Sequence, residues 1–361
     1  MSDLPPRARL PLLALGFVAL ALGVFSGLAR LGLVLDDTAA SLAAFHGPLM
    51  VAGFFGVVIA LERAVATGRL WAYAAPLACA VSGIALVAGQ SAAAAALQAT
   101  GAAILVLASL RFVAIQPALH TVTVAAGAVA LLAANLVWLA TAVPSLAVPG
   151  WAAFLVLTIA GERLELTRLL PRSPVAQALF LLIIATIATG AAWAHLHPAG
   201  ARVLGVALLA LAAWLGVFDL ARRTVRDRGL TRYTAVCLLS GYVWLAVAGA
   251  TVAVEGLVPG ARAYDAALHA LFVGFVFAMV FGHAPIILPA VLRVKLPYAP
   301  VFYLPLALLH AGVALRLAGD AAGSVPVLRA GGVANAVALA AFIVTAATAV
   351  LRARGRPSVP R

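Results

Sequence analysis

Charged side chains are scarce in this sequence: of 361 residues, 24 are Lys or Arg and 11 are Asp or Glu, while 65% are hydrophobic. A water-soluble core of this length could not bury so much apolar surface, which excludes a soluble enzyme and a disordered chain. Cysteine is scarcer still, and Cys79 and Cys237 form no CxxC motif. The sequence therefore predicts neither a disulfide framework nor a thiol redox motif. Walker, GxSxG, HExxH and CxxCH motifs are also missing.

The few charges lie in short clusters between apolar runs of about 18 to 25 residues, the length that crosses a bilayer as a helix. These runs predict an all-α, polytopic membrane protein in which residues 1–361 form a single transmembrane domain surrounded by membrane lipid. We expect the first run to be retained as a helix, because it is too long for the core of a signal peptide. The twelve predicted spans are 10–29, 39–61, 70–89, 92–110, 119–142, 149–167, 176–194, 203–221, 233–254, 265–291, 299–317 and 328–350.

The basic residues provide a test of this topology, because cytoplasmic loops are enriched in Lys and Arg. With the N-terminus inside, 19 of the 24 basic residues fall on the inner side. The sequence therefore predicts a multi-pass protein of a bacterial-type inner membrane, with both termini cytoplasmic. The formal net charge of +13 reflects this topology, and we expect no nucleic-acid partner. The inner residues are Arg7, Arg9, Arg63, Arg69, Arg111, Arg163, Arg168, Arg172, Arg222, Arg223, Arg226, Arg228, Arg232, Arg293, Lys295, Arg352, Arg354, Arg356 and Arg361.

A short internal similarity links the inner ends of the second, sixth and tenth spans. The segments are VIALERA (58–64), TIAGERL (158–164) and MVFGHAP (279–285), each four helices from the next. They are consistent with a threefold repeat of a four-helix unit, although small and apolar composition also produces such matches by chance.

Histidines are the main candidates for chemistry, because an ionisable group at membrane depth is costly and usually functional. His46 and His269 lie about 7 and 4 residues in from the outer ends of their spans, which places both at a depth of roughly 6 to 10 Å. They could therefore face each other across one flat ligand. His283 follows His269 by 14 residues, or about 21 Å of helix, so these two cannot hold the same ion.

Neutral imidazole is a good ligand for haem iron and for copper, and it adds no net charge to the membrane. We therefore predict haem, with copper as a further candidate, bound by His46 and His269, with His283 or His310 at a second site. His46, His269 and His283 are the candidate metal ligands. Small residues beside the first two, Gly47 and Gly274 among them, suggest room for a planar group.

Simpler interpretations stand beside this one. A membrane histidine often only bonds to a backbone carbonyl or a hydroxyl group, and this alternative applies to His120, His283 and His310. His195 and His197 close the outer end of the seventh span and suit a solvated loop. The pairs Glu62–Arg63 and Glu162–Arg163 at the inner boundary suggest ion pairing, with a proton-entry path as the alternative.

Three features together resemble subunit I of the haem-copper oxidases and, more closely, the NnrS-type membrane proteins. They are the twelve spans, the segment HGPLM that starts at His46, and the histidine near the outer start of the tenth span. NnrS-type proteins are twelve-helix proteins associated with haem and copper and linked to the nitric oxide response. The resemblance implies a quasi-threefold bundle and assigns the haem-ligand roles of the oxidases to His46 and His269.

The departures from that family limit the chemistry. Ala270 and Leu271 stand where the oxidases have the rest of a His-x-His motif, and residues 151–167 of the sixth span contain no histidine. An oxygen-reducing copper centre cannot be assembled, so we expect neither terminal oxidase nor nitric oxide reductase activity. The resemblance leaves a role in gas sensing, protection from nitrogen oxides or metal handling, with a redox or gas ligand as partner. The alternative is a secondary transporter of a small molecule or metal, although no paired inverted halves are visible.

Overall fold

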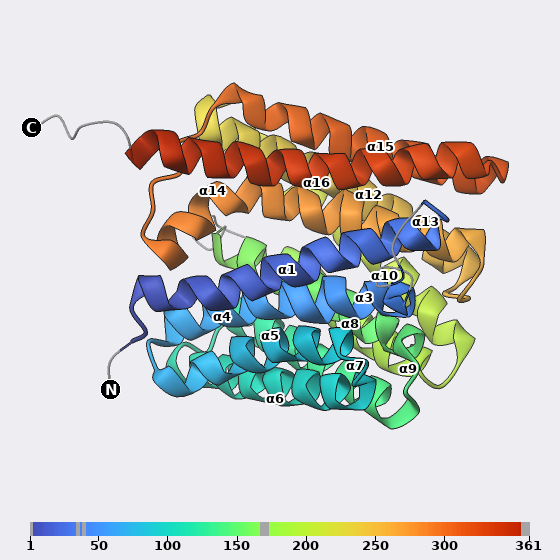
Figure 1. The fold of residues 1–361 in the computed structure, drawn as a ribbon, viewed down its shortest axis with the longest axis horizontal. Helices are drawn as coiled ribbons and strands as arrows, with labels where there is room; N and C mark the ends of the chain where they lie inside the picture. The colour runs from blue at the N-terminus through green and yellow to red at the C-terminus, as the bar shows by residue number, and fades with distance from the viewer. Residues whose placement is uncertain (1–2, 34–36, 38–40, 167–172, 355–361) are drawn as a thin grey trace, which may run out of the picture. The chain divides into compact units, whose positions relative to one another are not determined.

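Helices dominate the computed structural model, which describes residues 3–33, 37, 41–166 and 173–354. Twelve helices among these residues are long and apolar enough to span a membrane, which confirms the predicted all-α, polytopic fold (Figure 1). Of the predicted inner arginines, Arg168, Arg172, Arg356 and Arg361 lie outside the described residues. The spans are α1 (Pro6–Arg30), Ala43–Thr67, Leu70–Val87 with α5 (Ala74–Val87), α6 (Ser91–Ile115), α7 (Leu119–Thr141), α8 (Pro144–Leu166), α9 (Pro174–Ala194), α10 (Pro198–Phe218), α12 (Gly229–Glu255), Arg262–Leu292, Pro300–Ala322 with α15 (Tyr303–Ala322), and α16 (Val325–Arg354).

Prolines set the beginning of several helices earlier than the apolar pattern predicts. α8 begins at Pro144 rather than at residue 149, and α10 begins at Pro198 rather than at residue 203. Proline suits the first turn of a helix, because that turn does not need its missing N–H and its φ is already helical. Apolar runs alone therefore underestimate the lengths of these spans.

Contacts divide the chain into two compact units. Unit 1 comprises Met1–Leu211 with Gly249–Pro259, and unit 2 comprises Ala212–Ala248 with Gly260–Arg361. The long helices α10 and α12 each contribute residues to both units.

In unit 1, α1 lies against the second span, which consists of a 3-10 turn (Ala43–Phe45), α3 (His46–Pro48), a π-helix (Leu49–Phe55) and α4 (Gly56–Thr67). Small residues let the two backbones approach closely, as is usual between membrane helices. The contacting residues of each helix are three or four positions apart, so they form one stripe along the face of α1 and one along the face of the second span. Along this contact Val57 lies against Gly16, Gly53 against Ala19, Met50 against Gly23 and His46 against Gly27.

In unit 2, α15 and α16 run side by side (Figure 1). A Cβ added at Gly312 or Gly331 would meet the backbone of the partner helix at less than 3 Å, so glycine is needed for this approach. The core of the unit is aromatic. The rings of Phe281 and Phe342 stack at 3.9 Å between centroids, and Phe302 meets Phe342 edge-on.

Candidate functional site

His46 lies at the first turn of the second span and is held by α1. Its Nδ1 is 2.7 Å from the carbonyl oxygen of Gly23. A carbonyl can only accept, so Nδ1 carries the hydrogen, and in the neutral ring Nε2 carries the lone pair. Gly27 permits this contact, because a Cβ there would lie 2.8 Å from the imidazole Cε1. The chain thus presents the tautomer that ligates through Nε2.

His269 is the last residue of α13 (Arg262–His269) and has the same tautomer, but the carbonyl that accepts its hydrogen belongs to its own helix. Its Nδ1 is 2.8 Å from the carbonyl oxygen of Asp265, one turn earlier, and 3.3 Å from the Asp265 carboxylate. Arg316 of α15 holds that carboxylate through two hydrogen bonds, of 2.7 and 2.9 Å. A histidine that ligates a metal usually donates its other N–H in this way, which fixes the ring and increases its basicity.

A π-helix follows each of the two histidines in the chain, and the described residues contain no other π-helix. The π-helix after His46 covers Leu49–Phe55, and the one after His269 covers Ala270–Phe277. α14 (Ala278–Leu292) completes the tenth span. Short π-helical insertions are rare and often occur at functional sites. His46 belongs to unit 1 and His269 to unit 2, so their predicted role as two ligands of one haem stays a prediction.

His283 and His310 differ from each other in their bonding. The buried His283 in α14 also directs Nδ1 to a backbone carbonyl, that of Met279, at 2.7 Å. His310 in α15 uses both nitrogens, because Nδ1 accepts from Trp244 Nε1 at 2.9 Å and Nε2 lies 2.8 Å from Ser240 Oγ. A ligand role for His310 would break one of these two bonds.

The remaining histidines lie at the ends of spans. His120 at the start of α7 is buried, and its Nε2 has no hydrogen-bond partner among the described residues. His195 follows α9 and is half-buried; burial lowers its pKa, against a smaller opposing effect of a hydrogen bond with the backbone of Leu146. His197 is exposed and accepts a hydrogen bond from the backbone N–H of Ala199.

The glycines near the two histidines are packed by side chains. The ring of Trp244 lies against Gly274, Ala19 lies against Gly53, and Trp151 is in ordinary contact range of Gly47. These glycines let helices approach one another. At these positions protein side chains occupy the space in which the sequence suggested room for a planar group.

Sequence reasoning missed two polar networks. The first joins Asp265 to Arg316 and to His269, and the four-residue spacing of Asp265 and His269 is a signal for the contact within one helix. The second network lies buried in unit 1, where Trp151 donates to Asn135 and Asn135 donates to the backbone of Gln98. Gln98 in turn donates to Ser82. These are neutral residues on four different helices, and no sequence spacing connects them.

Within the part of the chain that the structure describes, no group of three or more His, Cys, Asp or Glu side chains could hold a metal ion. No candidate ligand therefore belongs to such a group among these residues, and each has its own supporting hydrogen bonds.

The chain matches, over residues 9–351, the family described as Domain of unknown function (DUF8744). This match covers nearly all of the sequence, and the chain belongs to that family. A comparison with curated proteins gives no match.

Proposed function

We propose that this member of the DUF8744 family is an integral membrane protein of the NnrS-like type that binds haem, copper or both through His46 and His269, to which the resemblance to the haem-copper oxidases assigns haem-ligand roles. It would act in the response to nitric oxide or in metal handling, not as a terminal oxidase. The distribution of Lys and Arg supports a bacterial-type inner membrane with cytoplasmic termini.

The observation that supports this proposal is that His46 and His269 share the same hydrogen bonding and the same helix type after them. Each directs Nδ1 to a backbone carbonyl, at 2.7 Å for His46 and 2.8 Å for His269, and each introduces a π-helix. The carbonyl at His46 belongs to a neighbouring helix and the carbonyl at His269 to its own helix, so one common packing arrangement does not explain the shared bonding.

Haem suits single imidazoles better than a bare metal ion does. The porphyrin supplies four nitrogen ligands, so the protein needs to provide only one or two. Zinc and copper centres take three or four ligands from protein. A bound haem would supply an iron that exchanges one electron or binds a small gas.

The residues of this chain would orient and tune the ligands. The carbonyl of Gly23 would hold the His46 ring through a hydrogen bond, and Gly27, which has no Cβ, leaves the space in which the ring lies. Asp265, held by Arg316, would orient the His269 ring, and its carboxylate next to Nδ1 would increase the basicity of Nε2 as a metal ligand.

Haem and copper per chain, measured on the detergent-purified protein from cells supplied with both, test the proposal. We expect bound haem or copper in the wild type, and a lower content in His46→Ala and in His269→Ala. His197→Ala, which changes an exposed histidine, is the control and should keep the wild-type content. A wild type without either group would contradict the proposal and favour the transporter alternative.

A further inference from the structure

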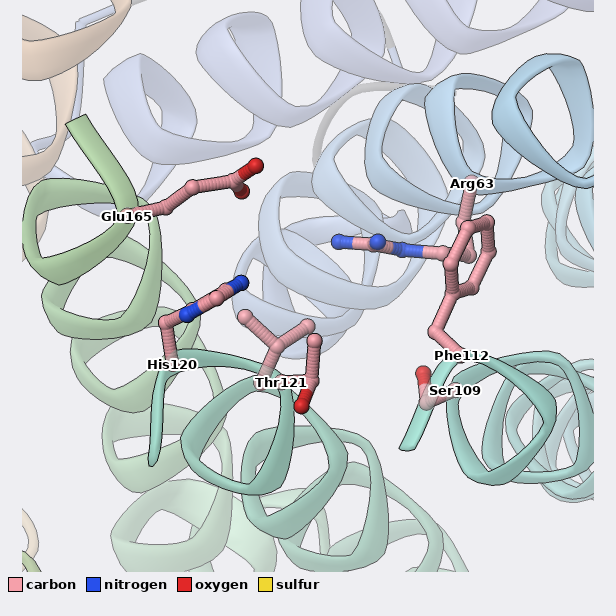
Figure 2. Close-up of a pocket in the computed structure, with 7 residues that line it drawn as sticks. Arg63, Ser109, Phe112, His120, Thr121 and Glu165 are labelled. Atoms are coloured by element: carbon pink, nitrogen blue, oxygen red, sulfur yellow. The ribbon is translucent and has the colours of Figure 1, made fainter. Parts of the chain in front are cut away.

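A small pocket lies in unit 1 where the ends of α4, α6, α7 and α8 meet, at the side that the arginines predict to be cytoplasmic (Figure 2). Its volume is about 20 Å³, which is enough for one water molecule. The side chains of Arg63, His120 and Glu165 point toward the same space from three helices. The complete lining is Arg63, Ser109, Phe112, His120, Thr121, Val124 and Glu165.

Two buried polar atoms of this pocket need a partner. His120 is 7% exposed and Ser109 is 2% exposed, and neither His120 Nε2 nor Ser109 Oγ has a hydrogen-bond partner among the described residues. Thr121 does not satisfy them, because its hydroxyl donates to backbone carbonyls at the start of its own helix. Since a buried polar atom without a hydrogen bond costs free energy, an occupant of the pocket that bonds to both atoms would stabilise the protein.

Two further polar groups border the same space. The guanidinium of Arg63 lies over the ring of Phe112, 5.0 Å from its centroid, and points into the pocket from α4 (Figure 2). Glu165 lines the pocket from α8 and is exposed, so the pocket reaches the surface of the protein.

The hydrogen-bonding capacities of this lining select the occupant. A guanidinium only donates hydrogen bonds, whereas a carboxylate has several lone pairs and only accepts them. A hydroxyl group and a neutral imidazole can do either. The occupant must therefore both donate and accept, and it must fit a space of about 20 Å³. Water meets both conditions with two to four polar partners, whereas a halide ion only accepts.

We propose that this pocket is a water-binding site. One water molecule bridges His120 Nε2 on α7 and Ser109 Oγ on α6, and Arg63 and Glu165 are its further hydrogen-bond partners. It exchanges with the aqueous phase past the exposed Glu165, so the buried imidazole of His120 is in hydrogen-bonded contact with that phase. α6 and α7 pack against each other, and the water links them at their inner ends. The site does not depend on haem or copper binding.

A crystal structure of the full-length protein that shows ordered water tests the proposal directly. We expect a density peak within about 3.2 Å of both His120 Nε2 and Ser109 Oγ. A second crystal, soaked in bromide, distinguishes water from a halide, because bromide gives an anomalous signal. A pocket without density would overturn the proposal, and an anomalous bromide peak in the pocket would overturn it in favour of an anion site.

A double-mutant cycle tests the bridge in detergent solution. Ser109→Ala, His120→Phe and the double variant are compared with the wild type by thermal unfolding. Each single variant already breaks the bridge through the water, so we expect the double variant to lose less in thermal midpoint than the sum of the two single losses. Additive losses would overturn the bridge.

Val124→Ala provides the matched control. Val124 also lines the pocket, but its apolar side chain cannot bond to the water. The cycle that combines Val124→Ala with Ser109→Ala should therefore give additive losses of the thermal midpoint. Coupling of the same size in both cycles would show repacking of the pocket and would overturn the role of the water.

Discussion

Arg316 donates two parallel hydrogen bonds to Asp265, from Nε to Oδ2 at 2.7 Å and from Nη2 to Oδ1 at 2.9 Å. The same Oδ1 lies 3.3 Å from Nδ1 of His269. The guanidinium on α15 therefore fixes the carboxylate that stands behind the candidate ligand on α13. Asp320 also interacts with Asp265, so the orientation of His269 depends on a small, partly buried network of charged groups.

The first prediction concerns this ion pair. Asp265→Asn should lower the free energy of unfolding by about 3 kcal/mol, because Arg316, only 7% exposed, loses the carboxylate that accepts two of its hydrogen bonds. This is the low end of the range for buried pairs, since the Asp265 side chain is 31% exposed. Denaturation in detergent micelles, followed by circular dichroism, measures the change. The double variant Asp265→Asn with Arg316→Met should recover part of the loss, and an unchanged midpoint in the single variant would contradict the prediction.

The same substitution should also weaken haem retention. At metal sites, removing the hydrogen-bond partner of a ligating histidine typically lowers the affinity for the metal by about 10- to 100-fold, and we expect a similar loss of haem affinity here. Haem titration of the solubilised Asp265→Asn protein gives this number. An affinity equal to that of the wild type would show that Asp265 does not act through His269.

The second prediction concerns Gly27 in α1. Gly27→Ala introduces a Cβ that would lie 2.8 Å from Cε1 of His46, so the ring must move from the Gly23 carbonyl. We expect Gly27→Ala to lower haem content as His46→Ala does. Gly216→Ala is the matched control, because a Cβ at Gly216 of α10 meets nothing within 4 Å. Equal haem content in the two glycine variants would contradict the prediction.

The sequence was sufficient for the fold but not for the geometry of the sites. Apolar runs and arginine spacing predict twelve spans, because bilayer thickness dictates the length of each run. They do not predict the bond between His46 and Gly23, which joins two helices, or the bond between Trp244 and His310, which depends on packing within unit 2. The π-helices after His46 and His269 escaped prediction as well, because hydropathy does not distinguish them from α-helix.

The third prediction concerns His310, whose two ring nitrogens are both engaged. His310→Phe should leave haem content unchanged and destabilise the protein by about 1–3 kcal/mol, because Trp244 Nε1 loses its acceptor. Haem content and an unfolding curve on the same sample separate the two effects. Loss of haem in His310→Phe, with the fold intact, would instead assign a ligand role to this residue.

The fourth prediction concerns pH. Burial lowers the pKa of His195 below its ordinary value of 6.5, so protonation favours the unfolded chain. The protonation of His195 therefore does not reduce the stability of the folded protein well above pH 6.5, and it reduces that stability increasingly as the pH falls below 6.5. The thermal midpoint in detergent should fall less steeply with acidification in His195→Gln than in the wild type. Parallel pH profiles of the two proteins would contradict this role of His195.

The central claim is that His46 and His269 ligate a haem, and the absorption spectrum of the reduced, purified protein tests it most directly. The account predicts a Soret band in the wild type that is lost or shifted in His46→Ala and in His269→Ala. A colourless wild type from haem-supplied cells, or a band that both variants leave unchanged, would contradict it.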